Sequence, residues 1–310
     1  MINKSELWVI NGKQQFVSVR SNMPNLPLLV YLHGGPGDAA LPLVHKYNRA
    51  LENHFTVVVW EQRGAGKSYY PFMANEPVNI QMMIDDIHGL VRQLLKKYSN
   101  EKVYLLGHSW GSMLGLKFIQ QYPALVHSYI GCGQVVNMLE GAKRQHGFVL
   151  SKSREYKQSK ITERLLTIDT TYSQNDWLND LLFVTRLVVK YKKSVYGKSN
   201  YNQFVKDFIL SPEYGLRDLI NREKGSLQSI KAFWPELMKV NFSETTAYEV
   251  PIVFMEGRYD EHVSSALAKE YYDSITTPKQ FYWFEKSSHF PQWSEAEKFN
   301  EIVSSLSGVK

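Results

Sequence analysis

The sequence has 310 residues, of which 44% are hydrophobic and 21% are charged. These proportions are those of a globular chain with a sizeable buried core, so they exclude a wholly disordered protein. No apolar run reaches the roughly 18 residues that a membrane-spanning helix needs, and the first residues show no apolar stretch after a basic start. We therefore expect a cytoplasmic protein that is neither exported nor bound to a membrane.

The single cysteine and the charge pattern limit the possible partners. Cys132 cannot form an internal disulfide and is expected to be a packed core thiol. The histidines show no metal-ligand spacing, so we expect no metal and no other cofactor. The net charge of +6 is concentrated in residues 134–249, which carry 18 Lys or Arg against 13 Asp or Glu. Since no nucleic-acid motif accompanies this excess, it is interpreted as a solvated face without a nucleic-acid partner.

The chain begins with a predicted hairpin and continues with buried strands. Apolar alternation in residues 6–10 and 16–19 predicts two strands, and Asn11-Gly12 between them favours a tight turn. Residues 80–98 carry apolar side chains at helical spacing. Short apolar runs predict strands that are buried on both faces of a parallel sheet, namely residues 28–32, 57–60, 103–106 and 252–255. Alternating strands and helices indicate α/β architecture, with a mostly parallel central sheet flanked by helices.

The alternation is interrupted in the middle of the chain by a long, mainly helical segment that is rich in aromatic residues. It resumes at Val250 with a strand, a helix, the strand of residues 281–284 and a last helix. The prediction is a core domain of residues 1–134 and 250–310 with an inserted helical cap of residues 135–249. Such an insertion leaves the sheet at the carboxyl ends of the strands, where ligands bind. We expect it to gate and shape the pocket, so that a short linker in its place alters selectivity far more than it disturbs the catalytic residues.

The sharpest motif is Gly107-His108-Ser109-Trp110-Gly111, which lies between a predicted strand and a helical pattern. A G-x-S-x-G sequence in this context is a nucleophile elbow, because the glycines relieve crowding at a tight strand-to-helix turn. Free N–H groups at the start of the following helix stabilise developing negative charge. We therefore predict that Ser109 is the nucleophile of a hydrolase, and its context disfavours a glycine-rich turn that contains serine by chance.

A second glycine-rich motif predicts the oxyanion-binding amides. His33-Gly34-Gly35-Pro36-Gly37 follows an earlier buried strand, where hydrolases of this architecture place an oxyanion donor. The N–H of Gly35 is expected to join that of Trp110, since glycines let the backbone approach the substrate closely. The occurrence of both motifs in one chain favours this interpretation over a plain tight loop.

The acid and the base must follow the serine in that order along the chain. Asp260 and His289 each lie just beyond a predicted strand and satisfy this order. Asp260 is predicted to orient the imidazole of His289, which takes the proton of Ser109 and later gives it to the leaving group. Glu256 remains an alternative acid. His262 precedes the last strand and is expected to be a surface histidine.

One further segment imitates a nucleotide-binding motif. Gly66-Lys67-Ser68 matches the end of a phosphate-binding loop, but that loop requires glycine where this chain has Glu61. We therefore do not expect nucleotide binding.

Taken together, these motifs resemble the α/β-hydrolase family that contains the proline iminopeptidases. The resemblance covers about two-thirds of the chain and rests on residues 33–37, 61–68 and 107–112 with the surroundings of Asp260 and His289. It implies an α/β-hydrolase fold, with the nucleophile, acid, base and oxyanion amides that the motifs predict. It also implies a helical lid over roughly residues 135–249. The family usually has aspartate where this chain has Glu61.

The resemblance implies release of an amino-terminal residue, preferably proline, from small peptides or amides. Such an enzyme must bind an ammonium group, normally through carboxylates. Phe233-Trp234-Pro235-Glu236 only loosely matches the Trp-Glu pairing that the family uses for this purpose. Glu213 and Glu236 are expected to face Ser109, because aromatic residues neighbour both. An esterase or lactonase that acts on a small acyl compound is the alternative, whereas the complete catalytic set disfavours a binding module without turnover.

Overall fold

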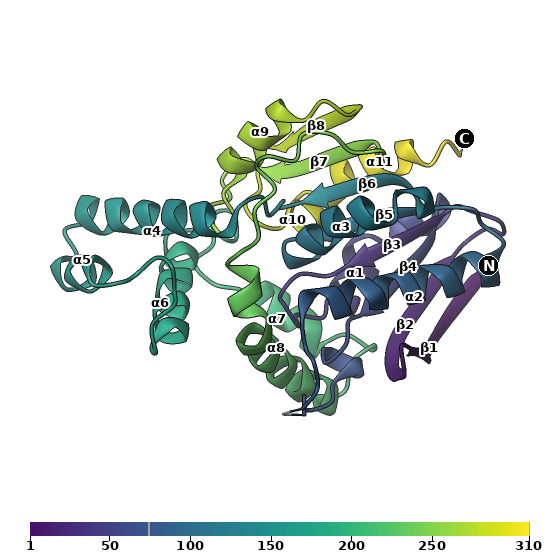
Figure 1. The fold of residues 1–310 in the computed structure, drawn as a ribbon, viewed down its shortest axis with the longest axis horizontal. Helices are drawn as coiled ribbons and strands as arrows, with labels where there is room; N and C mark the ends of the chain where they lie inside the picture. Colours follow the sequence, from purple (N-terminus) through teal and green to yellow (C-terminus); the bar gives the residue numbers. More distant parts are fainter. Residues whose placement is uncertain (74, 310) are drawn as a thin grey trace.

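The computed structural model describes residues 1–73 and 75–309 and contains an eight-stranded sheet (Figure 1). The strand order is β1-β2-β4-β3-β5-β6-β7-β8. β1 pairs antiparallel with β2, and β2 pairs antiparallel with β4, whereas all later neighbours are parallel. The strands are β1 (Ile2–Ile10), β2 (Lys13–Ser21), β3 (Leu28–Leu32), β4 (Thr56–Glu61), β5 (Val103–His108), β6 (Val126–Cys132), β7 (Ile252–Gly257) and β8 (Lys279–Phe284).

Helices cover both faces of the sheet, and five more lie in the segment between β6 and β7. The helices that flank the sheet are α1 (Leu41–Tyr47), α2 (Ile80–Tyr98), α3 (Trp110–Gln121), α9 (Ser265–Ser274), α10 (Pro291–Ser294) and α11 (Ala296–Leu306). The inserted helices are α4 (Met138–Glu155), α5 (Ser159–Leu166), α6 (Trp177–Lys190), α7 (Asn202–Ile209) and α8 (Leu216–Leu237). Short 3₁₀ turns occupy Arg49–Asn53, Gly66–Ser68 and Pro123–Leu125. None of the helices among the described residues is both long and apolar enough to span a bilayer.

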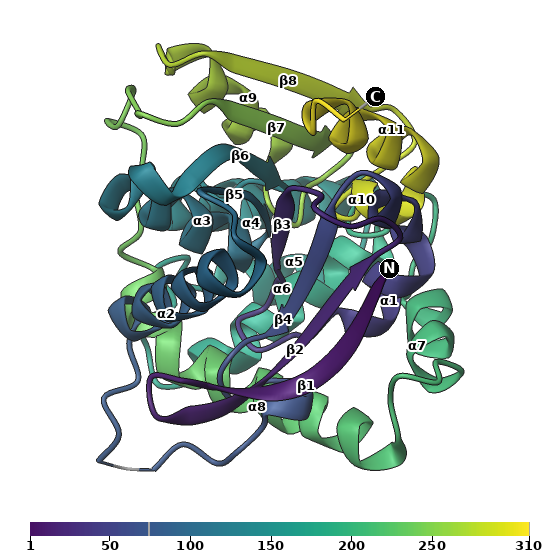
Figure 2. The same ribbon diagram turned by 90° about the vertical axis from the view of Figure 1, so that its right-hand side faces the viewer.

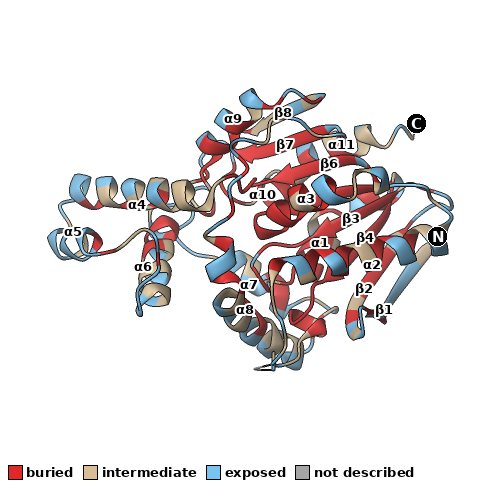
Figure 3. Cartoon of the chain, viewed as in Figure 1, coloured by how far each residue is buried: buried red, intermediate tan, exposed pale blue. Residues whose placement is uncertain are grey.

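The core forms two layers because successive strand residues point to opposite faces of the sheet. Val30 of β3 packs in the cluster that includes α2, α3 and α9, whereas Tyr31 packs in the cluster that includes α1 and α11. Figure 2 shows these helices on opposite faces, and Figure 3 shows that buried residues are concentrated in the sheet and in the helix faces turned toward it. Every residue of β3, β4, β5 and β7 is buried. The predicted α/β architecture with a mostly parallel sheet is therefore confirmed.

The predicted hairpin is present, and one strand was not foreseen. Asn11 and Gly12 both have positive φ, as the two-residue turn between β1 and β2 requires. The unforeseen strand is β6, which pairs with both β5 and β7. After Val126 its sequence continues with the exposed His127 and with Ser128, which interrupt the apolar pattern. At its end Cys132 is a buried free thiol, which donates to Oε1 of Gln292 at 3.1 Å, so the expected core thiol is confirmed.

A buried carboxylate connects the core to the inserted segment. Glu61, at the end of β4, accepts hydrogen bonds from the N–H of Lys67 at 2.5 Å and from the hydroxyl of Tyr214, which lies just before α8. The nearby ion pair between Lys67 and Asp218 of α8, at 2.7 Å, joins the same two parts. Burial raises the pKa of Glu61 to about 7, against these hydrogen bonds. The carboxylate thus occupies the loop in which a nucleotide-binding protein would hold phosphate.

The raised pKa of Glu61 makes the stability of this connection depend on pH. A carboxyl group with a raised pKa stabilises the fold most when the pH is below its ordinary pKa of 4.5. This contribution to the free energy of unfolding is lost as the pH rises through about 7. The amide in Glu61→Gln cannot ionise, so this variant does not lose stability in this way. The free energy of unfolding of the variant minus that of wild type should therefore rise by up to about 3 kcal/mol between pH 5 and pH 8. Urea unfolding at both pH values measures this change. Glu101→Gln, at an exposed position, is the control, and a pH-independent effect at Glu61 would contradict the account.

Candidate active site

Ser109 lies in the turn that connects β5 to α3. Its backbone has φ 53° and ψ −121°, a conformation that L residues rarely adopt. The glycines on either side make this turn possible. A Cβ at Gly107 would lie 2.3 Å from the carbonyl oxygen of Gly111, and one at Gly111 would lie 2.1 Å from that of Leu32. The sequence motif therefore forms the strained turn that was expected, with Ser109 as the residue that precedes α3.

The loop after β3 packs against this turn. A Cβ at Gly34 would lie 3.4 Å from that of Ser109, and both residues line one cavity together with Gly35 and Trp110. Among residues 1–73 and 75–309, the amide N–H groups of Gly35 and Trp110 donate no hydrogen bond. Both amides are therefore available to a ligand oxygen, which is what oxyanion stabilisation requires.

Asp260 and His289 lie on the loops that follow β7 and β8, and the structure brings them together. Nδ1 of His289 donates to Oδ2 of Asp260 at 2.7 Å, and both side chains are buried. Oδ1 of Asp260 accepts the amide N–H groups of His262 at 2.8 Å and Val263 at 3.0 Å. Burial raises the pKa of Asp260 to about 7 and lowers that of His289 to about 3. Because the two share one proton, they titrate as a pair, and the imidazole can accept a proton while the carboxylate compensates its charge.

Glu256, the alternative acid, does not contact the imidazole. It lies within β7, where Oε1 accepts the backbone N–H of Gln134 at 2.9 Å. Burial raises the pKa of this carboxyl group well above its ordinary value. The geometry favours Asp260 as the partner of His289.

The expected surface position of His262 is wrong. Its ring stacks on that of His289, with centroids 4.6 Å apart and planes 27° apart, and it lines the cavity. The loop after β7 is covered by the inserted segment, whose Ser194 Oγ lies 3.3 Å from Nδ1 of His262. Position along the chain does not reveal this cover, because it depends on how the inserted helices pack.

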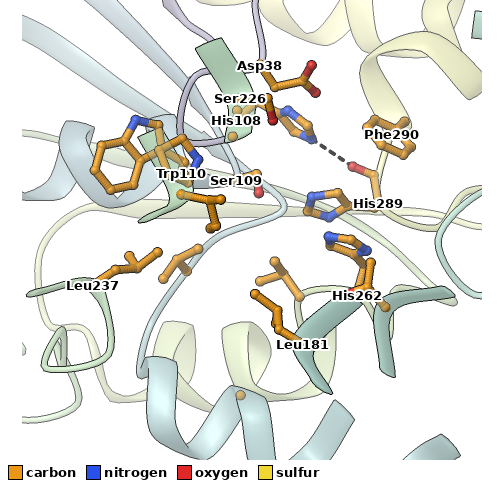
Figure 4. A pocket seen from close by; sticks show the side chains of 18 of the residues that line it. Asp38, His108, Ser109, Trp110, Leu181, Ser226, Leu237, His262, His289 and Phe290 are labelled. Atoms are coloured by element: carbon orange, nitrogen blue, oxygen red, sulfur yellow. Dashed lines mark hydrogen bonds between the residues drawn. The ribbon is translucent and has the colours of Figure 1, made fainter. Parts of the chain in front are cut away.

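The cavity has a volume of about 500 Å³ and is lined mainly by apolar side chains. Ser109, Trp110, His262 and His289 lie in its wall, as Figure 4 shows. The inserted helices supply a large part of the apolar lining, including Met138, Leu181, Phe204, Phe208, Ile230 and Leu237. The inserted segment therefore shapes the pocket. A pocket of this kind excludes water and suits an apolar group next to Ser109.

Glu213 and Glu236 do not face Ser109, contrary to the expectation. Glu213 pairs with Arg20 at 2.6 Å and with Nδ1 of His45 at 3.0 Å. Oε2 of the exposed Glu236 accepts the N–H of Ile80 at 2.8 Å, at the first turn of α2. Neither residue lines the cavity, because both carboxylates are held by partners on the core.

Other charged residues line the cavity instead. Asp38, directly after the glycine-rich loop, forms an ion pair with Arg222 of α8, and both line the cavity together with Glu223. Arg222 also lies over the ring of Phe208 at 4.2 Å and donates from Nε to the carbonyl of Ala39 at 3.3 Å. In the sequence, the one feature that could have indicated Asp38 as a cavity residue was its position next to the glycine-rich motif of residues 33–37. Within the described part of the chain, no three His, Cys, Asp or Glu side chains are grouped to hold a metal ion.

The glycine at the end of β7 allows the loops that carry Asp260 and His289 to pack closely. A Cβ at Gly257 would lie 1.9 Å from the carbonyl oxygen of Ser288. Gly257→Ala should therefore lower the free energy of unfolding by about 3 kcal/mol and separate the two loops, with loss of turnover. Thermal unfolding and a hydrolase assay measure both effects. Gly147→Ala, in α4 with no atom within 4 Å, should be neutral or slightly stabilising, and equal behaviour of the two variants would contradict this packing.

Comparisons with known proteins agree with this geometry. A family model described as alpha/beta hydrolase fold matches residues 27–296. The chain is 32% identical over 304 residues to the "probable aminopeptidase YbaC" of Bacillus subtilis (strain 168), covering 96% of this chain and 94% of that protein. It is 26% identical over 308 residues to a proline iminopeptidase of Heyndrickxia coagulans, covering 95% of each. The crystal structure of a Mycobacterium smegmatis proline iminopeptidase superimposes with a TM-score of 0.68 at 16% identity, over 98% of this chain and 97% of that one.

Proposed function

The chain belongs to the α/β-hydrolase family, and from this premise we propose that it is a serine hydrolase that releases an amino-terminal residue, preferably proline, from small peptides or amides. The observation that carries the proposal is the hydrogen bond between the buried Asp260 and His289, in a cavity that also contains Ser109. The aminopeptidase names of two similar proteins support the choice of substrate.

Each residue of the site has a defined role in the proposed reaction. The neutral imidazole of His289 takes the proton of Ser109 as Oγ attacks the carbonyl carbon, while Asp260 compensates the positive charge. The amides of Gly35 and Trp110 bind the oxygen that becomes negative. The imidazole then protonates the leaving amine, which leaves an acyl group on Ser109. A water molecule, deprotonated by the same imidazole, hydrolyses this ester and restores the serine.

The substrate's ammonium group is assigned to Asp38. Among the described residues, Asp38 and Glu223 are the carboxylates that line the cavity, and the side chain of Glu223 is 83% exposed. Asp38 is better sheltered and sits on the loop that supplies the amide of Gly35. A carboxylate binds an ammonium group through a charge-assisted hydrogen bond, which is strongest where water is excluded.

An esterase or lactonase is the second candidate, and a specific observation favours it. Arg222 already neutralises much of the charge of Asp38, and most of the remaining cavity wall is apolar. An uncharged acyl group therefore fits the same space without an unpaired charge. The same catalytic residues would serve this reaction.

Two alanine variants test the catalytic assignments. Ser109→Ala and His289→Ala should each lower kcat by about 10⁴-fold or more, because the nucleophile or its base is lost. Ser109→Ala should remain folded, since it removes a single hydroxyl group, and circular dichroism checks the fold of His289→Ala, which removes a buried ring. Hydrolysis of proline arylamides and short aryl esters gives the rates. Near wild-type turnover by either folded variant would reject the mechanism for that substrate.

A comparison of blocked and free substrates tests the role of Asp38. Wild type should prefer the proline arylamide with a free amine over its N-acetylated form. Asp38→Asn should lower kcat/KM for the free amine by about 10- to 100-fold, the value of a charge-assisted hydrogen bond, and should leave acetyl-ester hydrolysis within a few-fold. Preference for the acetylated compound would discard the aminopeptidase and favour the esterase. If wild type prefers the free amine and Asp38→Asn does not change this preference, only the assignment of the ammonium group to Asp38 would be rejected.

A further inference from the structure

The inserted segment is bound directly to the loops that carry the acid and the base. Ser194 lies between α6 and α7 and is fully buried. Its carbonyl oxygen accepts the backbone N–H of His289 at 3.0 Å, and the preceding carbonyl, of Lys193, accepts that of Glu261 at 3.2 Å. Two successive carbonyl groups of the insertion thus hold the loops that follow β8 and β7.

The side chain of Ser194 continues this connection to the ring next to His289. Oγ of Ser194 lies 3.3 Å from Nδ1 of His262 and 2.6 Å from the hydroxyl of Tyr201. The ring of His262 stacks on that of His289, and its backbone N–H donates to Asp260. Figure 4 shows His289 between His262 and His108. Nε2 of His108 donates to the carbonyl of His289 at 2.9 Å, and the two rings lie 4.8 Å apart.

These contacts restrict the imidazole in ways that its bond to Asp260 alone does not. One hydrogen bond fixes one ring nitrogen but leaves the ring free to swing about that contact. The stacked ring of His262 limits this motion, and the bond to the carbonyl of Ser194 fixes the backbone of His289. Burial lowers the pKa of both imidazoles to about 3, but only His289 has a carboxylate bound to its ring nitrogen, whereas that of His262 faces the hydroxyl of Ser194. His262 therefore stays neutral when His289 takes up a proton. A neutral aromatic face next to the imidazolium is favourable, whereas a second charge would repel it.

We propose that Ser194 and His262 are positioning residues for the imidazole of His289, so that the insertion is part of the catalytic apparatus as well as the wall of the pocket. This inference rests on the proposed role of His289 as the base. It contradicts the expectation that a short linker in place of residues 135–249 would leave the catalytic residues largely undisturbed, because such a linker removes the carbonyl that binds the backbone of His289.

Three substitutions separate the contacts of this arrangement. His262→Ala removes both the stacked ring and its hydrogen bond, whereas His262→Phe keeps a ring that can stack. Ser194→Ala removes only the hydroxyl group and keeps the backbone carbonyl. Lys198→Ala is the matched control, because this exposed side chain belongs to the same loop between α6 and α7.

The readouts are kcat, KM and the pH dependence of kcat/KM, measured with a small aryl ester. His262→Ala should lower kcat by about 10- to 100-fold with KM nearly unchanged, since misplacement affects the reacting geometry more than binding. His262→Phe should recover most of this loss, and Ser194→Ala should lower kcat about threefold or more. Opening the site to water raises the pKa of the imidazole, so the acid limb should move to higher pH by about half a unit or more in His262→Ala.

Unchanged kcat and an unchanged acid limb in a folded His262→Ala variant would overturn the proposal. If that variant does not fold, wild-type kcat in Ser194→Ala, which removes a single hydroxyl group, would overturn it. An effect of Lys198→Ala equal to that of Ser194→Ala would assign the loss to the loop as a whole and would also overturn it. Retained turnover in His289→Ala would instead reject the proposed function on which the inference rests.

Discussion

The backbone at the turn between β5 and α3 leaves no room for a side chain at Gly107 or Gly111, two residues before and after Ser109. A Cβ at Gly111 would overlap the carbonyl of Leu32, at the end of the neighbouring strand β3. This close approach places the loop after β3, with Gly35, beside the turn that carries Ser109. The loops after β7 and β8 reach the same edge, because parallel strands present their carboxyl ends together. The site is therefore a consequence of sheet topology and of one tightly packed turn.

Burial of the site has an energetic cost that its hydrogen bonds offset. Asp260 lies in an environment that disfavours its charged form, and it accepts two amide hydrogen bonds and one from His289. Burial raises the pKa of Asp260 and lowers that of His289, so it favours the neutral form of each group. The inserted helices supply much of the low-dielectric surroundings, and Ser194, between α6 and α7, contacts the loop that carries His289. The same segment thus lines the cavity and contacts the loop that carries His289.

The parts of the site that could be predicted from the sequence are those that local chemistry determines. Ser109 and Gly35 lie in motifs whose glycines are required by the turns themselves, and Asp260 and His289 lie at strand ends in a fixed order. Strand β6 was missed, since polar residues near its start interrupt the apolar pattern.

Residues whose roles depend on the path of the insertion could not be predicted. Glu213 and Glu236 have aromatic neighbours in the sequence but are held by Arg20, His45 and the start of α2. His262 enters the site only because the insertion covers its loop. Helical periodicity defines which face of a helix is apolar, but it does not specify which strand end that helix covers.

The central claim is that Ser109 is the nucleophile of this buried site, and covalent labelling tests it most directly. The protein is mixed with one equivalent of a reactive organophosphonate, the residual activity is measured, and the modified peptide is identified by mass spectrometry. The account predicts one phosphonyl group per chain, on Ser109, with activity lost in proportion and no labelling of Ser109→Ala. Labelling of a different residue with the same loss of activity, or full turnover by the labelled protein, would contradict it.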